Sequence, residues 1–254
     1  MLNQPPTNWQ SHQCLLSLKN HTLTSVFQPI LTKDWKTFGY EALLRVSNIN
    51  ETSSLTPPDE FIDSFSGKQR TLLEQLIIEL HLQNYADSWF IDEKLFINVS
   101  PGSLITLSQS FETKYFLKQL LSNLGIPQKS IVLEVKECAS PDEAALKSSC
   151  NKSVLGQVLL ALDDVTMCDL DTLRMGSLKP AIIKIDHSLI GEECNETANR
   201  KLEKFIKQCH RQGAMVVAEG IEDRATYLKA LALGVDLFQG YFISRPLPIE
   251  KLHL

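Results

Sequence analysis

Short apolar runs recur along the whole chain and alternate with longer stretches of helical character. Amphipathic stretches predict helices at Thr71–Tyr85, Tyr115–Leu124, Lys201–Gln212 and Arg224–Leu233. Runs rich in aliphatic and β-branched residues predict eight strands, at Val26–Ile30, Gly39–Leu44, Leu95–Val99, Ile131–Val135, Val158–Leu162, Ile182–Ile185, Met215–Ala218 and Asp236–Phe238. This alternation predicts an α/β fold with a mostly parallel sheet.

The number of strands favours a closed barrel over an open sheet. A length of 254 residues, 43% of them apolar, is enough for one (β/α)8 TIM-like barrel with a single large interior. A doubly wound open sheet would show the same alternation, but it predicts a glycine-rich first turn that the sequence lacks. Only Leu31–Phe38 joins the first two strands, which is too short for a helical crossover. We therefore predict a barrel whose first strand is antiparallel.

Residues before the first strand are expected to form a separate extension. We predict an N-terminal helix at about Asn8–Lys19, within an extension of residues 1–22 that packs outside the barrel. The barrel domain is then residues 23–254. No sensor, receiver or cyclase domain is expected before residue 22.

Composition excludes several classes of partner. The net charge of −5 argues against a basic surface for duplex nucleic acid. No apolar run approaches the length of about 18 residues that a membrane span needs, and the polar N-terminus is not a signal peptide. The six cysteines form no C-x-x-C pair, as expected for reduced thiols. We predict a cytoplasmic protein without a membrane segment.

Polar side chains occupy the ends of the predicted strands, where barrel enzymes place their active sites. Any one of them alone could be a solvated loop residue or a helix cap. Together they indicate a site, because all these strand ends meet at one rim of the barrel. The set comprises Glu41, Asn98, Glu134, Asp163, Asp164, Lys184, Asp186, Glu219, Glu222 and Gln239.

The chemistry of this set points to hard divalent cations. Burying so many acids costs several kcal/mol each unless they are paired, and one lysine cannot neutralise them. Carboxylate and amide oxygens suit Mg²⁺ or Mn²⁺. Two such cations sharing a carboxylate are a common device for phosphodiester cleavage. The dispersed histidines give no support to histidine-based metal or triad chemistry.

The polar positions fall within motifs that together resemble the EAL family, metal-dependent cyclic di-GMP phosphodiesterases with a (β/α)8 barrel. Glu41-Ala42-Leu43-Leu44-Arg45 is similar to the signature that names the family. The resemblance covers about Val26 to Pro248. The other motifs follow in the family's order: Phe27–Ile30, Asn98–Pro101, Leu133–Glu137, Leu162–Asp164, Lys184–Asp186, Ala218–Glu222, Gln239–Tyr241 and Arg245–Pro248.

The resemblance implies roles for individual residues. It implies metal ligation by Glu41, Asn98, Glu134, Asp163, Asp164 and Glu219, with Asp163 as the bridge. Catalytic roles are implied for Lys184, Glu222, Glu41 and Asp163, of which Lys184 orients or activates the attacking water. Arg45, Gln239, Leu43 and Arg245 are implied to bind substrate; a guanidinium such as that of Arg45 can bind phosphate oxygens in pairs.

The implied reaction opens cyclic di-GMP to linear pGpG with two Mg²⁺ or Mn²⁺ ions per site and is inhibited by Ca²⁺. Such a reaction lowers the messenger in bacterial signalling that controls biofilm and motility.

The chain departs from the family in the loop after the paired aspartates. Val165–Leu170 replaces a Phe-Gly-Thr-Gly type segment that helps to hold the second metal and contributes to a dimer contact. Both glycines are absent, so positive φ angles there become costly. Glu137, which resembles the residue that anchors this loop, remains. Lys136 replaces a position that is often a small hydroxyl residue and places a cation beside the site.

Three functions stay open on the sequence. The complete ligand set favours a phosphodiesterase, with a possible homodimer that the altered loop weakens. The alternative is a catalytically impaired domain that serves as a cyclic di-GMP receptor or binds a protein partner. A barrel enzyme acting on another phosphorylated metabolite shares the fold but gives no reason for the ordered motifs.

Overall fold

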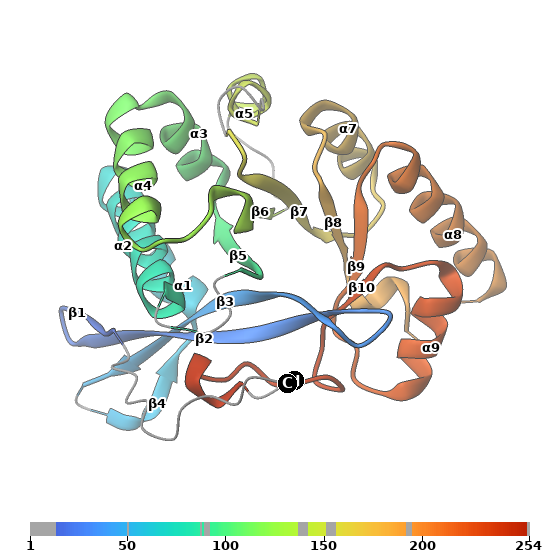
Figure 1. Ribbon diagram of the computed structural model, residues 1–254, viewed down its shortest axis with the longest axis horizontal. Coiled ribbons are helices and arrows are strands. Elements are labelled where there is room, and N and C mark those ends of the chain that lie inside the picture. The colour runs from blue at the N-terminus through green and yellow to red at the C-terminus, as the bar shows by residue number, and fades with distance from the viewer. Residues whose placement is uncertain are drawn as a thin grey trace.

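Ten strands form one sheet within the residues that the computed structural model describes, which are 14–49, 51–86, 88, 92–136, 142–150, 156–191 and 195–252. Eight of these strands close into a barrel, because the first of them pairs with both its second and its last member (Figure 1). The barrel strands are β2 (His21–Thr32), β3 (Thr37–Asn48), β5 (Lys94–Val99), β6 (Ile131–Lys136), β7 (Leu159–Val165), β8 (Ile182–Ile185), β9 (Met215–Ala218) and β10 (Leu237–Phe238).

Strand directions confirm the predicted TIM-like barrel with an antiparallel first strand. Neighbouring strands from β3 round to β10 pair in parallel, whereas β2 is antiparallel to both β3 and β10. Closure through β2 leaves this ring of eight without an exposed edge. Two short strands, β1 (Leu16–Leu18) and β4 (Glu51–Thr56), extend the sheet by pairing with β2 and β3.

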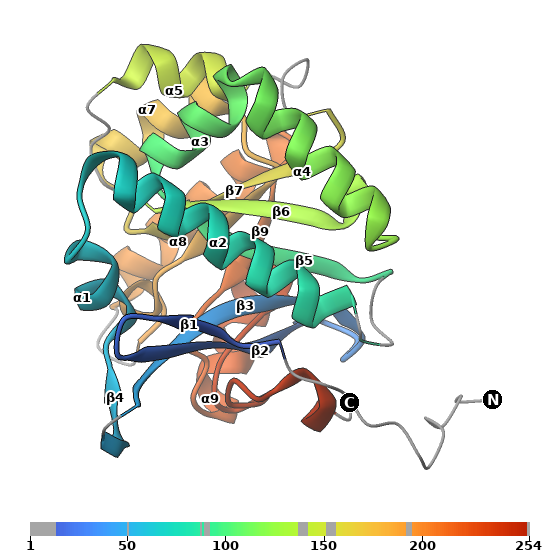
Figure 2. The same ribbon diagram turned by 90° about the vertical axis from the view of Figure 1, so that its left-hand side faces the viewer.

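Helices cover the outside of the barrel, as the alternating sequence pattern requires. Figure 2 shows α2, α3 and α4 lying across the outer side of the strands. None of the described helices combines the length and the apolar character needed to cross a bilayer. The helices are α1 (Pro58–Asp63), α2 (Gly67–Ala86), α3 (Pro101–Gln109), α4 (Phe111–Asn123), α5 (Glu143–Ser149), α7 (Asp169–Leu178), α8 (Glu196–Arg211) and α9 (Arg224–Leu233), with 3₁₀ turns at Gln128–Ser130, His187–Leu189 and Ile249–Lys251.

The predicted N-terminal helix is wrong where the structure describes it. Residues 8–13 lie outside the described residues, and Leu16–Leu18 is a strand that pairs antiparallel with β2. Leu16 and Leu18 are partly buried while Ser17 is exposed, which is the two-residue period of a strand. Lys19, with φ of 53°, turns the chain back into β2.

An apolar plug fills one end of the barrel interior. Its residues come one from each of seven strands and are almost completely buried. Side chains alternate along a strand, so residues two positions away from the plug residues, toward the open end of the barrel, face the same interior. The plug therefore forms the floor beneath the next layer of side chains. It consists of Ile30, Phe96, Val132, Ala161, Ile182, Val217 and Leu237.

A buried polar network joins α2 to the first strands. Ser25 Oγ lies 2.8 Å from His81 Nδ1, and Asn84 Nδ2 donates to Ser25 Oγ at 3.2 Å. Asn84 also accepts from the backbone N–H of Cys14 and donates to its carbonyl. Burial lowers the pKa of His81 to about 4, outweighing the opposing effect of Glu41. The network thus holds a neutral imidazole against β2.

Acid should destabilise the fold through His81. The unfolded chain takes up a proton near the ordinary histidine pKa of about 6.5, whereas the folded chain does so only near 4. Stability is therefore full above about pH 6.5 and falls by about 3 kcal/mol as the pH drops to 4. Urea unfolding of the wild type and of His81→Gln measures this. The variant should show a shallower loss over this window, and equal slopes would contradict the assignment.

Candidate active site

The polar residues lie in the layer directly above the apolar plug. In six parallel strands a site residue follows a plug residue by two positions, as Glu134 follows Val132 and Lys184 follows Ile182. In the antiparallel β2 the order reverses, so Gln28 precedes Ile30. Strand alternation and barrel closure therefore bring these side chains together. The layer contains Gln28, Glu41, Asn98, Glu134, Asp163, Lys184, Glu219 and Gln239.

The ammonium group of Lys184 lies at the centre of this layer. Its Nζ is 2.7 Å from Glu219 Oε1, 2.9 Å from Glu134 Oε1 and 3.0 Å from Asp163 Oδ1. Glu41 Oε2 is 3.4 Å away. Lys184 and Glu134 have no exposed surface. Four carboxylates thus share one cation that is itself shielded from bulk water, and the Glu219 side chain is the most exposed of the four, at 19%.

Amide side chains hold Glu41 in a fixed orientation. Asn98 Nδ2 donates to Glu41 Oε1 at 2.8 Å, and Gln239 Nε2 donates to Glu41 Oε2 at 2.6 Å. Gln239 Nε2 also lies 3.2 Å from Gln28 Oε1, and Gln28 Nε2 donates to the carbonyl of Ser244. Both oxygens of Glu41 are therefore positioned by neighbours on other strands.

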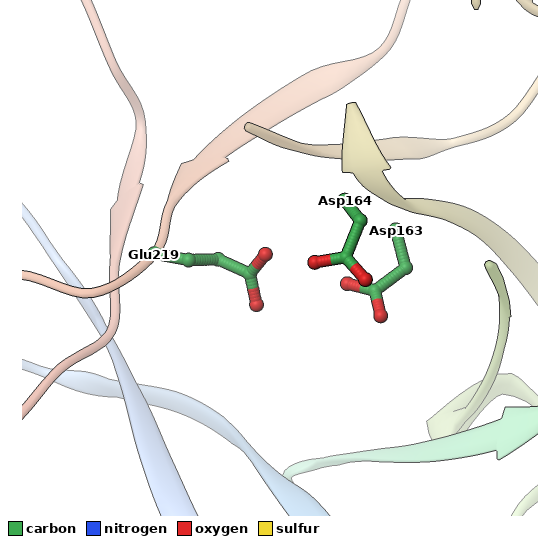
Figure 3. Close-up of side chains that lie close together, drawn as sticks. All are labelled: Asp163, Asp164 and Glu219. Carbon is green, nitrogen blue, oxygen red and sulfur yellow. The ribbon is translucent and has the colours of Figure 1, made fainter. Parts of the chain in front are cut away.

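A break in strand register brings two consecutive aspartates to the same side of β7. The pairing of β7 with β8 shifts between Leu162 and Val165, and Asp164 has a φ of 58°. Aspartate tolerates this left-handed conformation better than most residues. Carboxylate oxygens of Asp163, Asp164 and Glu219 lie within 4.8 Å of one another. Figure 3 shows Glu219 pointing toward the two aspartates from across the barrel mouth.

The electrostatics of the layer show an excess of negative charge. Burial raises the pKa of Glu134 well above its ordinary value, and burial raises that of Glu219 to about 8, although Lys184 opposes both shifts. For Glu41, Lys184 and the two amide hydrogen bonds outweigh burial and lower the pKa. Burial disfavours the charge on Lys184, but the surrounding carboxylates raise its pKa well above the usual value. The single ammonium is held charged and still leaves the carboxylates under-neutralised.

The residues present fit a site for hard divalent cations. Asn98 Oδ1 and Glu134 Oε2 are buried acceptors without a hydrogen-bond donor among the described residues. Such orphaned oxygens are costly unless something else binds them. Together with Asp163, Asp164 and Glu219 they form an all-oxygen ligand set, which suits Mg²⁺ or Mn²⁺.

Two arginines and an aromatic ring border the mouth above this layer. Leu43 and Arg45 follow Glu41 at two-residue steps on β3 and are half-buried. The guanidinium of Arg245 lies 4.2 Å from the centre of the Tyr241 ring, which is exposed. Burial lowers the pKa of Arg45, an effect that Tyr241 and Glu41 oppose. These residues offer positive charge and an aromatic face outside the carboxylate layer.

One expected site residue stands apart from the cluster, and a second cannot be placed relative to it. Glu222 is exposed in the segment after β9 and forms no ion pair with Lys184. Glu137 lies outside the described residues. Conversely, sequence reasoning assigned no role to Gln28 or Tyr241. The signal was available, because Gln28 is polar within an apolar strand and Tyr241 directly follows Gln239-Gly240.

The loop after the paired aspartates contains a positive φ angle, although it has no glycine to adopt that angle at low cost. Met167 has a φ of 64°, although neither it nor its neighbours Thr166 and Cys168 is glycine. A left-handed conformation costs a non-glycine residue roughly 1–2 kcal/mol. Met167 is partly buried against the main hydrophobic core, and this contact offsets part of the cost.

Comparison with protein families gives one match across most of the chain. The family model described as the EAL domain matches residues 11–246. A probable cyclic di-GMP phosphodiesterase of Escherichia coli, PdeN, is 28% identical over 94% of this chain and 46% of its own length. The E. coli cyclic di-GMP phosphodiesterase PdeL is 26% identical over 93% of this chain and 66% of its own. The chain thus spans about half to two thirds of the length of these relatives.

Solved structures support the fold. The EAL enzyme Bd1971, in a form with bound cAMP and cyclic di-GMP, superposes with a TM-score of 0.77 at 22% identity, over 90% of this chain and 63% of that one. Klebsiella pneumoniae BlrP1, in a complex with manganese and cyclic di-GMP, gives a TM-score of 0.73 at 23% identity, over 89% and 56%. At this identity the likeness establishes the same barrel architecture.

Removing the central cation should destabilise the metal-free protein. Lys184→Met keeps the volume but leaves four buried carboxylates without their shared partner, which should cost about 3–5 kcal/mol in the free energy of unfolding. Urea unfolding in a chelator at neutral pH measures this. Saturating Mn²⁺ should restore part of the loss, because a bound cation replaces the missing positive charge.

Lys207→Met is the matched control. Lys207 pairs with Glu203 on the exposed face of α8, so its loss should change stability by less than about 0.5 kcal/mol. A Lys184→Met protein as stable as this control would show that the ammonium is not what holds the carboxylate layer together.

Proposed function

The chain belongs to the EAL domain family, and from that premise we propose that it hydrolyses cyclic di-GMP to linear pGpG with two Mg²⁺ or Mn²⁺ ions. One observation carries the proposal: a complete buried layer of carboxylates and amides surrounds Lys184 and leaves oxygens without donors. A barrel with a purely structural role would not need a layer of buried carboxylates, whose desolvation costs free energy.

The proposed ligands are the oxygens that face the mouth. Glu41, Asn98, Glu134, Asp163, Asp164 and Glu219 would hold the cations, with Asp163 shared between them. When bound, such cations activate a water molecule and neutralise charge on the phosphodiester. These side chains would need no rearrangement of the backbone to converge, since five of them lie in one layer and Asp164 lies close to Asp163 and Glu219.

The protein's own groups then orient the reactants. Lys184 Nζ lies at the centre of the layer in contact with four carboxylates, and its N–H groups would hold the oxygen of the attacking water once the cations take up those carboxylates. Asn98 and Gln239 fix the carboxylate of Glu41 from both sides. Arg45, four residues beyond Glu41 on β3, would bind a phosphate of the substrate by paired hydrogen bonds.

A second function has an observation in its favour. The positive φ of Met167 lies in the loop directly after the paired aspartates, where strain can displace Asp164 from the geometry that hydrolysis needs. The domain would then bind cyclic di-GMP as a receptor, or bind a protein partner, without turnover. Both hydrolysis and binding of cyclic di-GMP concern a bacterial messenger, so we expect a cytoplasmic protein. Any homodimer is expected to be weakened by the same loop.

Incubation with cyclic di-GMP and Mn²⁺, followed by chromatographic separation of nucleotides, tests the proposal. Linear pGpG should appear with the wild type. Glu41→Ala and Asp163→Ala should each eliminate turnover, because each removes a ligand and a contact of Lys184. Wild-type rates in either variant would contradict the two-metal assignment. Tight binding without product in the wild type would identify a receptor.

Binding can be tested separately from turnover by calorimetry in Ca²⁺, which should support binding but not hydrolysis. Arg45→Ala should weaken cyclic di-GMP affinity by about 1.5–3 kcal/mol, the value of a hydrogen bond to a charged group. It should leave Mn²⁺ affinity unchanged, since Arg45 lies outside the carboxylate layer. An unchanged nucleotide affinity would contradict the placing of a substrate phosphate at Arg45.

A further inference from the structure

Lys136 is a second cation at the barrel mouth that the proposed reaction does not use. It is the last residue of β6 and lies two positions beyond Glu134, so it faces the same side of the strand. The parallel pairing of β6 with β7 places Lys136 directly beside Asp163. Lys136 therefore lies one layer above the carboxylates, on the side of the mouth where the two aspartates meet.

The one ion pair of Lys136 among the described residues is weak. Its Nζ lies 3.7 Å from Asp59 Oδ2 on α1, and the two side chains are 49% and 81% exposed. An ion pair so exposed contributes little to stability. Asp59 thus leaves the ammonium free to interact with the carboxylates below it.

The electrostatic partners of Lys136 include the aspartate pair. Burial lowers its pKa, but Asp59, Asp164 and Asp163 together raise it above the ordinary value. In return, Lys136 opposes the rise that burial and Asp163 produce in the pKa of Asp164. Lys136 therefore acts on the side of the layer where Asp163 and Asp164 lie, whereas Lys184 contacts the carboxylates at its centre.

We propose that the Lys136 ammonium competes with a divalent cation for the carboxylates of Asp163 and Asp164. The cation held by this pair then binds more weakly than the cation held by the other ligands. Like charges a few ångströms apart repel, and partial burial reduces the screening by solvent. The inference rests on the metal binding of the proposed function but not on turnover.

Mn²⁺ titration followed by electron paramagnetic resonance of the free ion tests this, because it needs no substrate. Lys136→Thr should strengthen the weaker Mn²⁺ association by about tenfold, the effect of removing one positive charge near a divalent ion. Lys136→Arg keeps the charge and should bind as the wild type does. Lys33→Thr is the matched control, since it makes the same change in the exposed β2–β3 turn at the opposite end of the barrel.

The outcomes separate this inference from the proposed function. Tighter binding in Lys136→Thr alone, with thermal melting that shows a folded protein, supports the inference even if no pGpG forms. Unchanged or weaker Mn²⁺ binding in that variant overturns it. Weaker cyclic di-GMP binding in Ca²⁺ with unchanged Mn²⁺ affinity also overturns it and makes Lys136 a phosphate contact. Absence of Mn²⁺ binding in every variant overturns both proposals.

Discussion

The contact of Lys184 with four carboxylates is the interaction on which the site depends. A single ammonium within 3.4 Å of Glu41, Glu134, Asp163 and Glu219 makes it possible to bury them together, but it does not neutralise them. Burial first, and then the neighbouring carboxylates, raise the pKa values of Glu134 and Glu219 even though Lys184 opposes the rise. A buried layer with fewer positive than negative charges is stable only if it takes up protons or cations. The same shortage of positive charge that disfavours the metal-free layer is what the proposed divalent ions would supply.

The barrel produces this layer by simple alternation. Six of the parallel strands contribute one plug residue and, two positions on, one polar residue, so the apolar floor and the polar layer are consecutive levels of the same interior. Two local departures complete it. The antiparallel β2 brings Gln28 against Gln239, and the register shift in β7 adds Asp164 beside Asp163. Gly240 allows the chain after β10 to cross the segment after β9, because a Cβ there would lie 2.2 Å from the backbone of Ile221.

Much of this arrangement could be predicted from the sequence, because strand periodicity and the polar strand ends are local patterns. All eight barrel strands and the layer residues from Glu41 to Gln239 follow from them. The strand β1 was mistaken for a helix, because its pattern is only three residues long and its partner β2 is what fixes it. The helices α1, α3, α5 and α7 were not predicted either; each has ten residues or fewer, which leaves little length for a helical period to show. The positive φ of Met167 depends on tertiary packing, so composition could show its cost but not its presence.

Crystals grown with saturating Mn²⁺ and cyclic di-GMP give the most direct test of the central claim, that the carboxylate layer exists to bind divalent cations. Anomalous scattering from manganese locates each ion independently of the protein model. The account predicts manganese in the layer, with Asn98 Oδ1 and Glu134 Oε2 among its ligands. A layer without anomalous signal, in which Lys184 keeps all four carboxylate contacts, would contradict it.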